Sequence, residues 1–297
     1  MDGLRLKSAP VIVSLLLSGA LAAQEVPGEG NRVLRGPGNA TWAPSVEEAR
    51  TRGGAEGKLV FIEFESAECG SCKRMQGLLY PAFDFEALLI DKVPVKVDIA
   101  SPEGREVAEK YGIAEAPAVL VLSPEGRIVF RMEGFMNAPD FYRHVHADLD
   151  AYRKFSRKIE QQDVPRLAPA EALESGRELY ERADPASALP RLARAVSHPK
   201  ATAAQRDEAR EVQAAVELEL GRPAAARQTI NRLIATTKSA DRRERGELFR
   251  AQIPLAENKP AEALALFRKF LRDHPRSPHA GGVRELVEKL QGATGKP

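Results

Sequence analysis

Hydrophobic and polar positions divide the chain into an N-terminal part with alternating strand and helix patterns and a C-terminal part with helix patterns alone. Continuous or alternating apolar runs predict strands, and apolar residues recurring every three or four positions predict helices. The predicted strands are residues 58–65, 93–99, 118–122 and 127–133. The predicted helices between and around them are residues 46–52, 69–80, 83–90, 102–111 and 138–159. This order predicts an α/β domain with a mixed central sheet flanked by helices.

The first predicted helix has a start signal and a stop signal. Ser45, followed three residues later by Glu48, forms a capping box ahead of the helix. Gly53, Gly54 and Gly57 are expected to end it.

From residue 168 onward the strand signals vanish, and a P-A-x-A pattern recurs. It begins at Pro185, Pro223 and Pro260, so the spacings are 38 residues (185 to 223) and 37 residues (223 to 260). Each copy starts a helix with proline in its first turn and follows another helical segment. Helix pairs at such a period stack into a solenoid, since one pair cannot bury its own apolar face. These units resemble tetratricopeptide repeats; an irregular helical bundle is the alternative.

The first residues read as an export signal. Arg5 and Lys7 precede an apolar stretch over residues 9–20, which is too short to span a bilayer, and Ala20-Leu21-Ala22 offers a cleavage site. We therefore predict a signal peptide over 1–22, a Gly- and Pro-rich flexible leader over 23–39, and a periplasmic or otherwise extracytoplasmic protein. An uncleaved anchor or a buried helix is the alternative. No later run reaches membrane length, so no membrane span is expected after cleavage.

Composition narrows the possible partners. The chain of 297 residues has 44 Lys and Arg against 42 Asp and Glu, a net charge of +2. Such a balance implies no broad basic field, so nucleic acid is excluded as an expected partner. The chain has only two cysteines, Cys69 and Cys72, so no structural disulfide framework is expected and the two thiols act on each other or on a partner molecule.

The two cysteines stand where a buried strand gives way to a helix. The free N–H groups and the positive end of the helix dipole favour a thiolate at Cys69, which makes it the expected nucleophile. Cys72 follows one helical turn later and is expected to resolve the mixed disulfide. No cofactor is required, because the cysteine pair itself carries two electrons.

Residues 58–148, with this C-G-S-C motif, closely resemble the thioredoxin superfamily. Trp42 and the segment after Gly134 add a similarity to the C-terminal thioredoxin-like domain of the periplasmic disulfide reductase DsbD and to related exported proteins. The resemblance implies that Glu63, six residues before Cys69, handles the proton of the resolving cysteine. It also implies that Pro117, after Ala116, is a cis-proline that positions the substrate backbone. The alternatives are a Glu63 that faces solvent and a Pro117 with an ordinary trans peptide bond.

The sequence departs from the pattern of the superfamily in two places, and these leave open whether the protein reduces, oxidises or isomerises disulfides. Glu68 precedes Cys69 where most relatives have tryptophan, and an anionic neighbour opposes thiolate formation, which Lys73 offsets in part. The dipeptide between the cysteines is Gly-Ser, which matches neither thioredoxin nor the strong oxidants.

Two other functions compete for the same residues. The first is a zinc site in which His144 and His146 join the two cysteines. The two histidines are two residues apart on a predicted helix, so they are expected to point in different directions. The second is a non-catalytic scaffold that uses the thioredoxin fold as a docking platform and the repeats to bind a partner.

The sequence therefore predicts a thiol–disulfide oxidoreductase in several parts. The predicted parts are a thioredoxin-like domain over 40–155, a linker over 156–168, tetratricopeptide-like repeats over 169–292 and a disordered tail over 293–297. The predicted catalytic residues are Cys69, Cys72, Glu63 and Pro117, with no metal. The expected partners are protein substrates with cysteines, a redox partner thiol protein and a possible protein partner on the repeats.

Overall fold

The computed structural model describes residues 40–81 and 83–294. The predicted signal peptide and leader lie outside these residues, as do residues 295–297 of the predicted tail. The chain separates into two compact units between Gln161 and Gln162.

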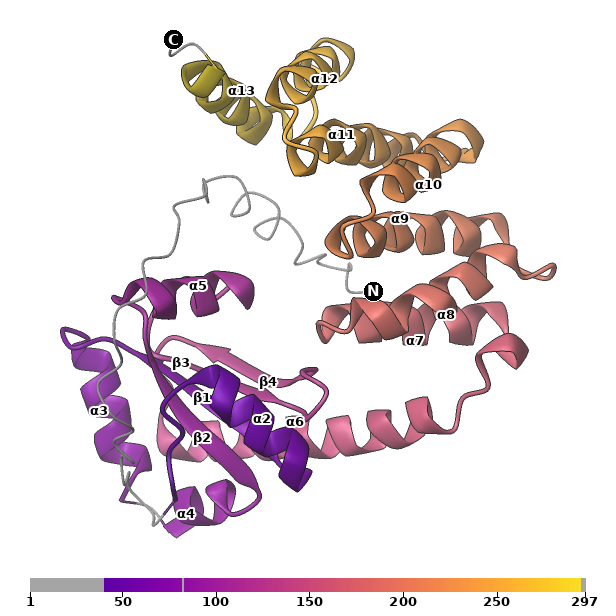
Figure 1. Ribbon diagram of the computed structural model, residues 1–297. Coiled ribbons are helices and arrows are strands. Elements are labelled where there is room, and N and C mark those ends of the chain that lie inside the picture. The colour runs from indigo at the N-terminus through magenta and orange to yellow at the C-terminus, as the bar shows by residue number, and fades with distance from the viewer. Residues whose placement is uncertain (1–39, 82, 295–297) are drawn as a thin grey trace. The chain divides into compact units, whose positions relative to one another are not determined.

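A four-stranded mixed sheet forms the centre of the first unit (Figure 1). Its strands are β1 (Leu59–Glu65), β2 (Lys92–Asp98), β3 (Ala118–Leu122) and β4 (Ile128–Glu133). The spatial order is β2-β1-β3-β4, with β1 parallel to β2 and β3 antiparallel to both of its neighbours. The mixed sheet predicted from the alternation of elements is confirmed. Its central strand β1 leads directly into the cysteine motif.

Helices cover both faces of this sheet. They are α2 (Val46–Glu56), α3 (Gly70–Leu79), α4 (Phe83–Leu89), α5 (Pro102–Lys110) and α6 (Ala138–Glu160). Val60 and Ile62 of β1 share one hydrophobic cluster with Ala49 of α2 and Ala108 of α5. Successive side chains of a strand point to opposite faces, so Phe61 faces the other way and makes an edge-on ring contact with Phe85 of α4. Glu63 therefore points to the face that carries α4.

The expectation that three glycines end α2 is wrong for the first two. Ser45 caps the helix by accepting the N–H of Glu48 at 3.2 Å, which is the first of the two hydrogen bonds of the predicted capping box. The helix then continues through Gly53 to Glu56, and Gly57 ends it in a left-handed conformation with φ 64°. A Cβ at position 53 would lie 2.9 Å from the carbonyl oxygen of Lys58. Glycine at 53 therefore lets the helix lie close to the backbone of Lys58 and is not a stop signal.

The long helix α6 enters the predicted linker. It runs to Glu160, because Phe155 and Ile159 continue its buried stripe. A short 3-10 helix, Val164–Arg166, follows in the second unit.

The described residues of the second unit form helices joined by short turns, with no strand. Its helices are α7 (Pro169–Glu181), α8 (Pro185–Ser197), α9 (Ala203–Glu219), α10 (Pro223–Thr236), α11 (Ala240–Ala256), α12 (Pro260–Asp273) and α13 (Ala280–Thr294). Consecutive helices contact each other along the chain. The last helix extends two residues into the predicted tail.

The turns between paired helices repeat the sequence period. Ala183, Gly221 and Asn258 have positive φ values of 61°, 69° and 56°, and they are 38 and 37 residues apart (183 to 221 to 258). Buried side chains recur with the same spacing; Leu192 is followed by Ile230 and then Phe267, each at most 1% exposed. The helical unit is thus compatible with structural repeats.

The first copy of this turn has Ala183 at the position with positive φ, and the middle copy has Gly221 there. The two residues are therefore expected to differ in their effect on stability. Ala183→Gly is expected to raise the free energy of unfolding by about 0.5–1 kcal/mol, because a left-handed conformation costs a residue with Cβ roughly 1–2 kcal/mol. Gly221→Ala is the matched control and should lower it by a similar amount. Urea denaturation of both variants measures the effect; equal stabilities would contradict the repeat geometry.

Candidate redox site

The two cysteines form a disulfide at the start of α3. Their Cα atoms are 5.2 Å apart. Cys69 is the N-cap of the helix, and its Sγ accepts the backbone N–H of Cys72 at 3.0 Å. Cys72 is 1% exposed, whereas Cys69 is only half-buried. The first sulfur is therefore the one that an outside molecule reaches, and it lies where helix N–H groups stabilise negative charge.

The hydroxyl of Ser71 is a further group at this sulfur. Its Oγ lies 3.3 Å from Sγ of Cys69, within hydrogen-bonding distance for sulfur. A hydroxyl can donate to a thiolate, so in the reduced protein Ser71 would add to the stabilisation given by the backbone. In the sequence, this serine stands out only as part of an unusual dipeptide between the cysteines.

Ser71→Ala is expected to raise the pH at which Cys69 alkylation is half-maximal by about 0.5–1 unit, since the variant loses one hydrogen bond to the charged form. Ser71→Thr keeps a hydroxyl and should restore most of the shift. Ser66→Ala is a matched control, because the Ser66 carbonyl that accepts the Cys69 N–H at 3.1 Å is part of the backbone. An unchanged midpoint in Ser71→Ala would contradict a role for the hydroxyl.

Glu63 is buried beneath α3, which excludes the solvent-facing alternative. It is 3% exposed. Its Oε1 accepts the side-chain amide of Gln76 at 2.9 Å, and its Oε2 accepts the hydroxyl of Tyr80. Cys72, Gln76 and Tyr80 are spaced four residues apart and so share one face of the helical path. The carboxylate is therefore held one helical turn from the resolving cysteine.

Burial raises the pKa of Glu63 above its ordinary value. Hydrogen bonds from Tyr80 and Gln76 and the charge of Lys96 act in the opposite direction, but desolvation is the largest cause. Desolvation, together with the nearby carboxylate of Glu63, also raises the pKa of Tyr80. A carboxyl group in this environment can accept and release a proton closer to neutral pH than an exposed one.

The polar cluster continues from Glu63 to the protein surface. Lys96 lies opposite Glu63 in the parallel register of β1 and β2, with Nζ 4.0 Å from Glu63 Oε2 and 3.1 Å from Glu65 Oε2. The same Nζ lies 5.5 Å from the ring of Trp42, which packs edge-on against Tyr80. Buried Glu63 is thereby linked to groups that are partly open to solvent.

Pro117 lies at the same end of the sheet as the cysteines. The Ala116–Pro117 peptide bond is cis, as predicted. Ala118 follows and pairs with Phe64 near the end of β1, five residues before Cys69. The fold thus brings Pro117 and the strand end that precedes the cysteines to one edge.

The cluster around Glu63 was not predicted from the sequence. Gln76 and Tyr80 had a usable signal, because both are polar and lie four and eight residues after Cys72. Lys96 and Trp42 come from other elements, and only the sheet register and packing bring them to this place.

The zinc alternative gains no support from the geometry. Within residues 40–81 and 83–294, no three His, Cys, Asp or Glu side chains are grouped so that they could hold a metal ion. His146 instead stacks on Tyr142 of the same helix.

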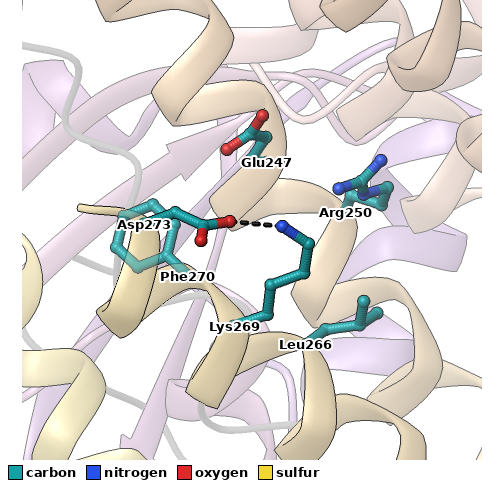
Figure 2. A pocket seen from close by; sticks show the side chains of 6 residues that line it. All are labelled: Glu247, Arg250, Leu266, Lys269, Phe270 and Asp273. Atoms are coloured by element: carbon teal, nitrogen blue, oxygen red, sulfur yellow. Dashed lines mark hydrogen bonds and ion pairs between the residues drawn. The ribbon is translucent and has the colours of Figure 1, made fainter.

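A hollow in the second unit is too small for a ligand (Figure 2). It lies between α11 and α12, and its volume of about 10 Å³ leaves room for about one water molecule. Lys269 and Asp273 pair across its edge.

In the part of the chain that the structure describes, no helix is long and apolar enough to cross a membrane.

Comparison with known proteins identifies a thioredoxin-like domain in the first unit. Residues 46–147 match the family model of the thioredoxin-like domain. A thioredoxin from Thermus thermophilus is 27% identical, with 36% of this chain and 85% of that chain covered and a TM-score of 0.34. A putative disulphide-isomerase from Bacteroides thetaiotaomicron is 28% identical (37% and 93% covered, TM-score 0.34). The DsbD C-terminal domain of Neisseria meningitidis is 20% identical (34% and 91% covered, TM-score 0.32). Among curated protein sequences, none matches this chain.

Proposed function

Since residues 46–147 form a thioredoxin-like domain, we propose that this protein catalyses thiol–disulfide exchange on the cysteines of other proteins. The observation that carries the proposal is the disulfide at the N-terminus of α3, with one accessible and one buried sulfur. The buried carboxyl group of Glu63 on β1, which Gln76 contacts one helical turn after Cys72, supports it.

In the reducing direction, the Cys69 thiolate attacks one sulfur of a substrate disulfide. The substrate S–S bond breaks, a mixed disulfide forms, and one substrate thiolate leaves. Cys72 then gives its proton to the Glu63 carboxylate and attacks Sγ of Cys69. The Cys69–Cys72 bond forms, the second substrate thiolate leaves, and two electrons have passed to the substrate. Oxidation of a substrate dithiol is the same sequence reversed.

The wider proposal places the protein outside the cytoplasm and gives the helical unit a recruiting role. The n-region, apolar stretch and cleavage site of residues 1–22 support export. The repeating turns and buried positions support a stacked helical surface of the kind that binds proteins. A redox partner thiol protein would restore the cysteine pair after each turnover.

Insulin reduction by dithiothreitol tests the catalytic proposal against a non-catalytic scaffold. The full chain should shorten the lag before the insulin B chain aggregates, and a variant with serine at both 69 and 72 should behave as the buffer blank. If the full chain and the double variant gave the same lag, the catalytic proposal would fail.

A further inference from the structure

Two side chains of β4 hold the loop that leads to Pro117, and neither was singled out in the sequence. We propose that Arg131 and Glu133 are positioning residues of the redox site: they fix the backbone ahead of Pro117, against which a substrate chain lies during exchange. This inference rests on the proposed function and deepens it. It concerns how a protein substrate is held, as distinct from the sulfur chemistry.

Arg131 holds the first part of the loop. Its guanidinium donates from Nη1 to the carbonyl oxygen of Tyr111 at 2.8 Å and from Nη2 to that of Gly112 at 2.5 Å. Gly112 has φ 64°, a left-handed conformation just after the end of α5. The planar fork of arginine suits two neighbouring carbonyl groups in a way that the single ammonium of lysine does not.

Glu133 holds the next part and orients the arginine. Its Oε2 accepts the backbone N–H of Ala114 at 3.0 Å, and its Oε1 accepts Nε of Arg131 at 3.1 Å. The following residue, Gly134, donates its backbone N–H to the carbonyl oxygen of Pro117 at 2.8 Å. Arg131, Glu133 and Gly134, at and just after the end of β4, thus hold the loop from its beginning to Pro117.

The loop depends on these partners because it lies outside regular structure. The two carbonyl groups and the Ala114 N–H lie between the end of α5 and the start of β3, so no strand or helix ladder pairs them, and backbone polar groups need partners. An ion pair this exposed, with side chains 37% and 29% accessible, contributes little stability of its own. The ion pair therefore acts mainly through its hydrogen bonds to the loop.

The sheet register places this arrangement at the redox end of the domain. Ala118 pairs with Phe64 of β1 on one side and with Glu133 of β4 on the other. Arg131 lies opposite Leu120, whose side chain belongs to the cluster shared with α2 and α5. Both β4 side chains therefore lie on the α5 face, where the loop leaves that helix.

The test separates substrate holding from sulfur chemistry in the full chain. Arg131→Ala and Glu133→Ala are expected to raise KM for insulin about five- to tenfold, with kcat changed less than about twofold. The rate at which dithiothreitol reduces the Cys69–Cys72 disulfide should stay within about twofold of wild type, because this small thiol needs no backbone platform. Arg131→Lys should recover only part of the loss.

Arg153→Ala is the matched control, because Arg153 is an exposed arginine of the same unit that pairs with Asp150 at 2.9 Å. If wild type reduces insulin and both alanine variants keep its KM, the inference is overturned. Equal slowing of the insulin and dithiothreitol reactions would also overturn it, since that indicates general damage to the domain. Should Arg131→Ala not fold, Glu133→Ala carries the same comparison. Failure of wild type itself with insulin would count against the proposed function.

Discussion

Cys69→Ser is expected to abolish disulfide exchange, with a loss of about 10³-fold or more, because it removes the accessible sulfur of the cysteine pair. Cys72 cannot replace it, since that residue is 1% exposed and lies inside the first turn of α3. Insulin reduction by the full-length variant measures the loss.

Cys72→Ser is expected to fail in a different way. Its Cys69 can still attack, but no second sulfur completes the reaction, so the variant should accumulate as a mixed disulfide with its substrate. Non-reducing gel electrophoresis, followed by mass spectrometry of the trapped product, detects this species. The two serine variants are each other's control, and trapping by Cys69→Ser in place of Cys72→Ser would reverse the roles assigned here.

Glu63→Gln is expected to slow turnover about 10²-fold, because the amide keeps the size of the side chain but cannot take the proton of Cys72. The loss should be greatest near neutral pH, where the carboxylate form is needed. Glu65→Gln is the matched control: this neighbouring carboxylate also contacts Gln76 and Lys96 but is part-exposed. Similar losses in both variants would indicate a general charge effect in place of proton transfer.

The same substitution has a second, independent readout in stability. The pKa of Glu63 is raised in the folded protein, mainly by burial, so its protonated form is favoured there. Its stability contribution is fully present below the unfolded pKa near 4.5 and is lost as pH rises through the higher folded pKa. Glu63→Gln cannot ionise, so its stability relative to wild type should increase between acidic and neutral pH. Urea unfolding at several pH values checks the sign, and a decrease would contradict the buried-carboxyl account.

The sequence predicted most strongly the features that depend on neighbouring residues. The strand over 118–122 was placed at its observed bounds, because AVLVL stands between a proline and a turn. Glu63 could be predicted as buried, because it stands inside a continuous apolar run that forms the central strand of the sheet. Cys69 at a helix N-terminus follows from the strand pattern that ends just before it.

The features that the sequence did not predict depend on distant residues meeting. Gly53 looked like a stop signal, and only its close approach to Lys58 shows that it serves packing. The cluster around Glu63 gathers side chains from β2, from α3 and its C-terminal end, and from the segment before α2. Arg131 and Glu133 looked like ordinary polar residues of an edge strand, since nothing in the local pattern shows that a loop some 20 residues earlier packs against them.

Alkylation of the reduced, folded protein, mapped to each cysteine by mass spectrometry, tests most directly whether one sulfur is reactive and the other shielded. At neutral pH we expect iodoacetamide to label Cys69 at least about tenfold faster than Cys72, with both labelled alike after denaturation. Labelling of neither thiol in the folded protein, or of both at the same rate, would contradict the account.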